Sequence, residues 1–389
     1  MRTGIVGAVL LAAGLISVAT GVLPGDDALA VATRVWPILL FVLAITVVTE
    51  LASEAGLFTV VAERLATWGL NRAWLMWMLV VALASLCTIF LSLDTTAVLL
   101  TPVVVVLAQH VGLSPLPFAL TTIWLANSAS LLLPVSNLTN LLAEHQLASG
   151  PFSGPGGFVA LMAVPALACI LVPSAVLFVI YRRDLLVRYI VTRADAPADR
   201  PLLIVSAVVV VLLIPALVSG IPVWIPSCIA ALVLVGVFAA RRREVLRLSL
   251  LPWQIVVFAS GLFFVVQGAG TVGLTPILDA MVGSGESLPD LLQLSAVAVG
   301  GANLVNNLPA YLAIEPVTTS PLRLAVLLIS VNAGSLITPW ASLATLLWHQ
   351  RLKALDVEIS WTKYVLLGLV VVPLTVVPAV ALLYLTHGG

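Results

Sequence analysis

The side chains able to do chemistry in this sequence are amides, hydroxyls and a carboxyl, gathered at four interruptions of otherwise apolar runs. Amides and hydroxyls both donate and accept hydrogen bonds, which suits the binding of a small hydroxylated solute. The apolar runs contain neither a Ser/His/Asp grouping nor a metal-ligand spacing, so we expect no catalytic residue and no metal site. The predicted binding residues are Asp94, Thr95, Thr96, Asn127, Ser130, Ser136, Asn137, Asn306, Asn307, Asn332, Ser335 and Thr338.

We expect membrane-spanning helices to hold these groups in place. Of the 389 residues, 61% are hydrophobic and 9% are charged, whereas a soluble domain carries about 25% charged residues. Apolar runs of about 20 residues, the length that crosses a bilayer core as a helix, recur along the chain. Single spans are predicted at 4–22, 36–53, 157–181, 202–219, 222–240, 253–272 and 363–385.

Arginines gather in two loops, at 182–200 and 241–247, and the positive-inside rule places both loops in the cytoplasm. Suppose that residues 73–110 and about 287–318 enter the membrane as hairpins and turn back. Then only Arg34 and Arg323 among the basic residues lie outside. This arrangement predicts about nine crossings of the plasma (inner) membrane, a cytoplasmic N-terminus and a C-terminus outside.

The two halves of the chain resemble one another. W-P-I-L-L-F from Trp36 matches W-Q-I-V-V-F from Trp253, and N-S-A-S-L-L-L-P-V-S-N from Asn127 matches N-A-G-S-L-I-T-P-W-A-S from Asn332. With the topology above the two repeats have opposite orientations, which is typical of secondary transporters that bind cargo near the midplane. We predict a first repeat at 1–185, a cytoplasmic Arg-rich linker at 186–200 and a second repeat at 201–389.

Each predicted repeat contains one hairpin and one broken helix. The hairpin at 73–110 carries Asp94 at its tip, and its counterpart at about 287–318 carries Asn306 and Asn307, with the alignment uncertain by one residue. A proline interrupts each of the helices at 116–143 and 322–348, which frees backbone groups that must find partners. Asp94 followed by two threonines also resembles a helix N-cap, a role compatible with binding.

The charge around these elements favours a neutral cargo. No lysine or arginine lies near any of the four interruptions, and an acidic side chain there repels anions unless it is protonated. Because a low dielectric favours the protonated carboxyl, Asp94 suits a proton carrier coupled to a neutral solute. Coordination of sodium by Asp94 is the alternative that the residues leave open.

Several of these segments resemble those of the arsenite efflux permeases, the arsenical pump membrane proteins of the ion transporter superfamily. The resemblance rests on I-T-P-W-A-S-L-A-T-L-L-W, P-W-Q-I-V-V-F, V-N-N-L-P, L-L-T-P-V-V-V and V-S-N-L-T-N, and it covers nearly the whole chain. The first tip departs from that branch, which often has Asp-Gly where this chain has Asp94-Thr95.

The resemblance implies an all-α polytopic membrane protein, an inverted-repeat transporter of the elevator type with two re-entrant hairpins and two broken helices. It implies export of arsenite and antimonite, neutral trihydroxy acids, in exchange for protons, with the proton gradient in place of any cofactor. The expected partners are this cargo and the lipid bilayer, without nucleic acid. A soluble ATPase energises the permease in some members, and a homodimer is compatible with the sequence. The alternative is a sodium- or proton-coupled carboxylate or oxyanion transporter.

Overall fold

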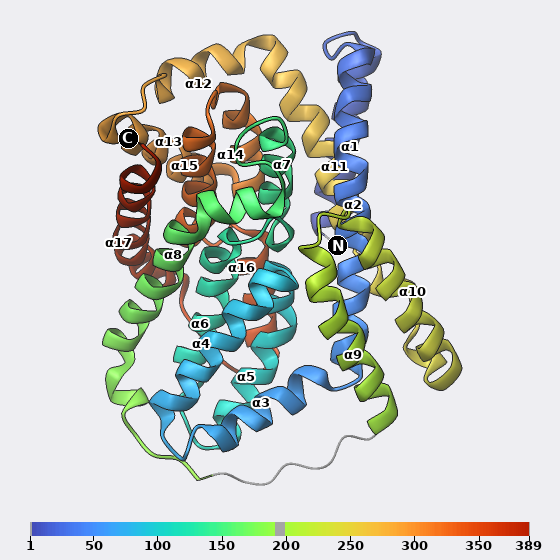
Figure 1. The fold of residues 1–389 in the computed structure, drawn as a ribbon, viewed down its shortest axis with the longest axis vertical. Helices are drawn as coiled ribbons and strands as arrows, with labels where there is room; N and C mark the ends of the chain where they lie inside the picture. The colour runs from blue at the N-terminus through green and yellow to red at the C-terminus, as the bar shows by residue number, and fades with distance from the viewer. Residues whose placement is uncertain (1, 191–198, 389) are drawn as a thin grey trace.

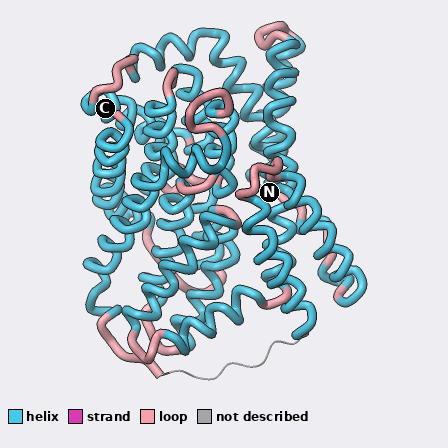
Figure 2. The backbone as a smooth tube through the Cα atoms, viewed as in Figure 1, coloured by secondary structure: helices cyan, strands magenta, loops and turns pink. Residues whose placement is uncertain are grey.

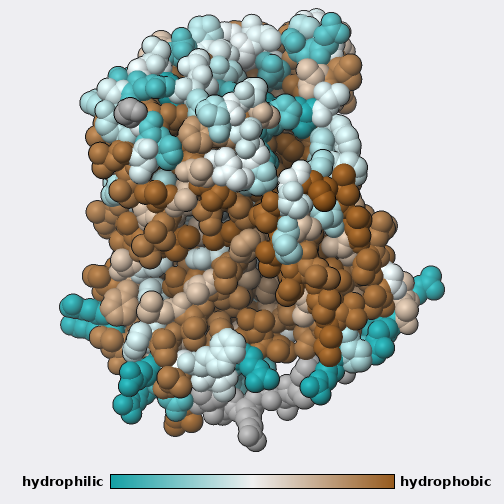
Figure 3. All heavy atoms as spheres, in the orientation of Figure 1, coloured by the Kyte–Doolittle hydropathy of each residue, from teal (hydrophilic) through white to brown (hydrophobic). Residues whose placement is uncertain are grey.

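The computed structural model describes residues 2–190 and 199–388, which form helices and turns, with one isolated bridge between Arg72 and Arg188 and no strand. Eight helical segments in these ranges are long and apolar enough to cross a bilayer, and Figure 3 shows an apolar band between two more polar ends. The chain is therefore a multi-pass membrane protein. The eight segments are α2 (Gly25–Glu54), α4 (Ala73–Phe90), α8 (Gly154–Leu185), α9 (Arg200–Leu217), α10 (Trp224–Arg241), Trp253–Val282, α13 (Leu288–Val305) and α17 (Trp361–His387).

Two of the predicted spans have different ends in the structure. The span expected at 36–53 begins earlier, at Gly25, because Asp26 and Asp27 stabilise the positive N-terminal end of α2. The span expected at 253–272 is α11 (Trp253–Ala269), which continues through a π-helical turn into α12 (Thr275–Val282). The first span forms α1 (Arg2–Ala19). The linker predicted at 186–200 lies in part on residues 191–198, outside the described residues, and the repeat boundaries stay predictions.

Both hairpins and both broken helices are present, and the predicted fold class is confirmed. Figure 2 shows loop segments in the middle of the bundle between these helices, as well as at its two ends. The first hairpin is α4, a π-helix (Thr95–Leu100) and α5 (Thr101–His110), and the second is α13 and α14 (Asn307–Ile314). The broken helices are α6 (Pro115–Ser128) with α7 (Leu138–Leu147), and α15 (Pro321–Asn332) with α16 (Leu343–Lys353).

The helices form two bodies, which Figure 1 shows side by side. The hairpin body consists of α4 to α8 and α13 to α17, and so contains both hairpins and both broken helices. The wall body consists of α1, α2, α9, α10 and α11. Any cargo that binds at the hairpin tips lies where these two bodies meet.

Packing inside the wall body is crossed between the two halves of the chain. Helix α1 lies along α11, and α10 lies against α2, so each half supplies a helix that covers the other half's long helix. The contact of α1 with α11 is close: a Cβ atom on Gly261 would lie 2.3 Å from the backbone nitrogen of Leu11. The glycine is needed because two backbones approach there without side chains between them.

Two short helices lead from the wall body to the hairpin body on opposite sides of the molecule. Helix α3 (Leu57–Trp68) runs along the lower edge in Figure 1, and α12 runs along the upper edge. Gly56 and Gly273, which the repeat aligns, have φ angles of +83° and +112° at the corners where the chain turns into these helices. Such angles strain residues with a Cβ atom, so glycine is favoured at both corners.

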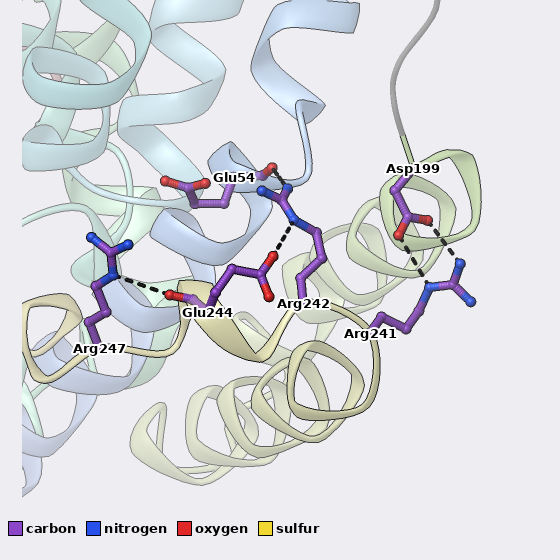
Figure 4. A network of polar contacts seen from close by, with 6 residues as sticks. All are labelled: Glu54, Asp199, Arg241, Arg242, Glu244 and Arg247. Atoms are coloured by element: carbon purple, nitrogen blue, oxygen red, sulfur yellow. Dashed lines mark hydrogen bonds and ion pairs between the residues drawn. The ribbon is translucent and has the colours of Figure 1, made fainter.

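The arginine-rich edge of the wall body is held by a polar network (Figure 4). Arg241 at the end of α10 pairs with Asp199 before α9 at 3.2 Å. Arg242 donates to the backbone carbonyl of Glu54 at the end of α2, at 3.0 Å. The hydrogen bond from the Leu202 amide, together with Arg241, holds the pKa of Asp199 below its usual range. The network ties the ends of three wall helices on one side of the molecule.

Candidate functional site

The two hairpin tips turn in the same way. Ser92 and Asn306 have φ angles of 151° and 136°, an uncommon conformation for residues with a Cβ atom. Each then caps the returning limb: Ser92 Oγ accepts from the Thr95 amide at 3.2 Å, and Asn306 Oδ1 accepts from the Leu308 amide at 3.3 Å. The tips therefore align Ser92 with Asn306. The capping role considered for Asp94 belongs to Ser92, and Asp94 corresponds to Leu308 rather than to either asparagine.

A cavity of about 100 Å³ lies where the hairpin tips, the helix breaks and the wall body meet. Five of the predicted binding residues line it: Asp94, Ser136, Asn137, Asn306 and Asn307. They come from both hairpin tips and from the first break, elements up to about half the chain apart in sequence. The fold thus brings these polar groups to one place, and their part in binding stays a prediction.

The carboxyl of Asp94 has no counter-ion at this cavity. It makes no hydrogen bond to another group among residues 2–190 and 199–388, and within those ranges no lysine, arginine or histidine lines the cavity. The carboxyl is half-buried and faces a space lined by neutral amides and hydroxyls. A group placed in this way is free to take up a proton or a cation, or to accept a hydrogen bond from a solute.

The two threonines after Asp94 bond within the first hairpin. Thr95 Oγ1 lies 3.0 Å from Ser92 Oγ, and Thr96 Oγ1 accepts from Thr88 Oγ1 at 2.8 Å. Both are buried and neither lines the cavity. They stabilise the tip that carries Asp94, so their predicted contact with cargo gains no geometric support.

Four further predicted residues belong to a buried network at the two helix breaks, and three of them, Asn127, Asn332 and Ser335, bond across from one broken helix to the other. Asn127 Oδ1 accepts from Ser335 Oγ at 3.3 Å, and Asn332 Oδ1 accepts from Asn137 Nδ2 at 2.7 Å. Ser130 Oγ donates to the carbonyl of Asn127 at 2.7 Å. Asn127, Ser130, Asn332 and Ser335 are fully buried and lie outside the cavity lining. Through Asn137, however, the network holds one cavity amide in place.

The backbone groups freed at the proline breaks are satisfied by two asparagines that sequence reasoning missed. Asn140 Nδ2 donates to the carbonyls of Ser130 and Leu133, at 2.5 and 3.1 Å, in the first break. In the second, Asn303 Nδ2 donates to the Gly334 carbonyl at 2.7 Å, and Asn303 Oδ1 accepts from the Thr338 amide at 2.9 Å. The sequence does contain a signal for these two residues. Each break leaves backbone groups that need hydrogen-bond partners, and each asparagine interrupts an apolar run near a break.

Thr338 is the remaining predicted residue, and it too is engaged at the second break. Its Oγ1 donates to the carbonyl of Asn303 at 2.9 Å, and it does not line the cavity. Three polar cavity residues were not predicted: Thr46, Ser92 and Ser342. The repeat could have found Ser342, because the alignment from Asn127 on Asn332 places Ser342 opposite Asn137.

A second acidic group lies away from the cavity, at the end of the second hairpin. Glu315 is 5% exposed, pairs with Arg34 of α2 and accepts a hydrogen bond from the Tyr311 hydroxyl at 3.0 Å. Arg34 also donates to the Leu142 carbonyl of α7 at 3.1 Å. One arginine of the wall body therefore holds two elements of the hairpin body.

Comparison with known proteins decides the family. A family model described as citrate transporter matches residues 3–321. An arsenical pump membrane protein of Yersinia enterocolitica is 30% identical over 384 residues, which cover 91% of this chain and 87% of that protein. The chain belongs to the arsenical pump membrane protein family of ion transporters.

Other members of this family match over a similar extent. The arsenical pump membrane protein of Escherichia coli is 30% identical over 389 residues, which cover 92% of this chain and 88% of that protein. The solved structure of the YdaH transporter of Alcanivorax borkumensis, reported to have an unusual topology, has a TM-score of 0.58. It is 16% identical and covers 94% of this chain and 90% of that one, so it supports the fold alone. The relatives named here are membrane transporters, and that class holds for this chain.

Proposed function

We propose that this transporter exports arsenite and antimonite in exchange for protons, by displacement of the hairpin body against the wall body. The relatives that match over nearly the whole chain are named arsenical pumps. The predicted topology, with the N-terminus in the cytoplasm and the C-terminus outside the plasma membrane, belongs to the same proposal. The proton gradient is the energy source in this proposal, and a soluble ATPase partner and a homodimer are both compatible with it.

The observation that carries this proposal is the carboxyl of Asp94, which has no partner within residues 2–190 and 199–388 and lies in a cavity that these ranges otherwise line with neutral groups. A neutral trihydroxy acid offers three hydroxyls, each a donor and an acceptor, and amides and hydroxyls match it without charge. An anionic cargo would meet a carboxyl there and, among the residues that the structure describes, no cation. When Asp94 is protonated, the hairpin body can move in one direction without cargo. When Asp94 is ionised, it can accept a hydrogen bond from the cargo, and the hairpin body can carry the cargo in the other direction.

The second candidate is a sodium- or proton-coupled transporter of carboxylates or other oxyanions. The match to a family model described as citrate transporter favours it. The cavity disfavours it, because recognition of a multiply charged carboxylate normally uses arginine or lysine, and none lines this cavity within the described residues.

The deciding experiment uses purified protein in liposomes with an imposed pH gradient and no ATP. We expect arsenite and antimonite flux that follows the pH gradient in the wild type and loses this dependence in Asp94→Asn. Asp27→Asn, at the exposed start of α2, is the matched carboxyl-to-amide control and should behave as wild type. Sodium-dependent uptake of citrate, without arsenite flux, would refute the proposal in favour of the second candidate.

A further inference from the structure

The cavity has two unlike sides. The hairpin body contributes apolar side chains, Leu93 and Leu308 among them, together with seven that are able to hydrogen-bond: Ser92, Asp94, Ser136, Asn137, Asn306, Asn307 and Ser342. The wall body contributes an apolar surface, with residues from α2 and α11: Phe41, Val42, Ile45, Thr46, Ile255, Phe258 and Ala259. Thr46 is its one hydroxyl, and that hydroxyl donates to the Val42 carbonyl of its own helix at 2.7 Å. Hydrogen bonds to cargo therefore come from one side of the cavity.

The two phenylalanines of this apolar surface are equivalent in the repeat. Phe41 ends W-P-I-L-L-F and Phe258 ends W-Q-I-V-V-F, so each half of the chain places one ring at the same cavity. Phe41 is 2% exposed. The position of Phe258 is set by α1, since a Cβ atom on Gly7 would lie 2.9 Å from the Phe258 Cα. Both rings belong to helices held firmly within the wall body.

A two-sided cavity suits a two-sided solute. Arsenite and antimonite as neutral trihydroxy acids are pyramidal, with three hydroxyls on one side of the central atom and its lone pair on the other. The hydroxyls can bond the hairpin body while the lone-pair side rests on the rings. Silicic acid is also neutral, but it is tetrahedral, so a fourth hydroxyl must point at the wall. A hydroxyl buried against an apolar surface loses its hydrogen bonds to water without replacement.

We propose that Phe41 and Phe258 are specificity-determining residues: they form an apolar wall that accepts the lone-pair side of a pyramidal oxyacid and rejects one with a fourth hydroxyl. The proposal rests on the proposed arsenite transport and names the residues that select its cargo. It also fits a wall whose one lining hydroxyl, that of Thr46, donates within its own helix, since a cargo bonded only to the hairpin body is free to move with it.

The test compares arsenite and silicic acid flux in liposomes for Phe41→Asn and Phe258→Asn, each with its matched leucine variant. Asparagine and leucine have similar size and shape and differ in polarity. We expect the wild type and both leucine variants to favour arsenite by roughly 100-fold, the discrimination that an apolar pocket achieves against one extra hydroxyl. Each asparagine variant should narrow this ratio by about tenfold, because its amide can bond the fourth hydroxyl.

The outcomes separate this inference from the function on which it rests. A wild type that moves arsenite, with asparagine variants that keep the full preference, overturns the wall as the selecting element. A leucine variant that loses the preference as fully as asparagine also overturns it, because ring shape rather than apolarity would then decide. A wild type that moves no arsenite overturns the proposed function itself. Phe41 and Phe258 lie on different helices, so if a variant at one position fails to fold, the variants at the other position still test the proposal. Size-exclusion elution in detergent checks whether each variant is folded.

Discussion

The first and second halves of the chain build the same elements and put different chemistry on them. The first hairpin tip carries a carboxyl, Asp94, where the second carries Leu308. The second hairpin ends in Glu315, which is paired with Arg34 of the first half. The shared elements form the cavity at the junction of the halves. Under the proposed function, proton coupling depends on a carboxyl that only the first half carries at its tip, whereas the ion pair takes one side chain from each half.

The largest effect is expected from moving the carboxyl from one tip to the other. Asp94→Asn should reduce flux driven by the pH gradient to the level of protein-free liposomes, because no other acidic side chain lines the cavity in the described ranges. Adding Leu308→Asp should restore part of it, since Leu308 lines the same cavity at the equivalent position. Proton-coupled arsenite flux measures both. Full flux in the single variant would show that coupling does not use this tip.

The pair between the halves should give the next largest effect. Arg34→Leu leaves the buried Glu315 carboxyl without its cation, which should cost about 3 kcal/mol of stability. Arg34→Leu with Glu315→Gln should recover most of that loss, because no buried charge then remains. Thermal unfolding in detergent, analysed as a double-mutant cycle, gives the coupling energy. Additive losses would mean that the two side chains do not stabilise each other.

Substitutions at the two helix breaks should have smaller effects on stability, and the two breaks can be compared with each other. Asn140 is fully buried and Asn303 is half-buried, and each bonds freed backbone groups of one break. Replacement by leucine leaves those groups unpaired, at a cost of about 1–3 kcal/mol. We expect the larger loss at Asn140, where water has less access to replace the amide. An equal or opposite order in thermal unfolding would show that burial does not decide the cost.

The smallest effect concerns Asp199, whose side chain is partly exposed. Its pKa is lower in the folded chain than in the unfolded one, so the folded state is stabilised above the ordinary pKa of an aspartate. That stabilisation should be lost as the pH falls through the lowered pKa. Asp199→Asn should remove this part of the pH dependence while the amide oxygen still caps α9. The check is the unfolding temperature of both proteins against pH in the acidic range, where parallel curves would contradict the expectation.

The main elements of the fold could be predicted from local sequence because their causes are local. Apolar runs of membrane length, prolines inside two of them and polar residues at two hairpin tips are each visible within about 20 residues. The matching tryptophan-to-phenylalanine segments, beginning at Trp36 and Trp253, and the aligned Gly56 and Gly273 then relate the two halves. Helix ends were less predictable, as α2 shows, because charged residues in a first turn can extend a helix beyond its apolar run.

Which polar residues face the cavity was decided by the tertiary structure. Asn127 and Asn137 are the same residue type in one broken helix, yet Asn127 bonds the other broken helix and only Asn137 also lines the cavity. Arg34 and Glu315 are 281 residues apart, so no local pattern could pair them. The apolar runs, their interruptions and the similarity of the two halves can all be read from the amino-acid order alone. The packing of the two halves determined which interruptions meet, because hydrogen bonds between distant helices depend on how those helices are placed against each other.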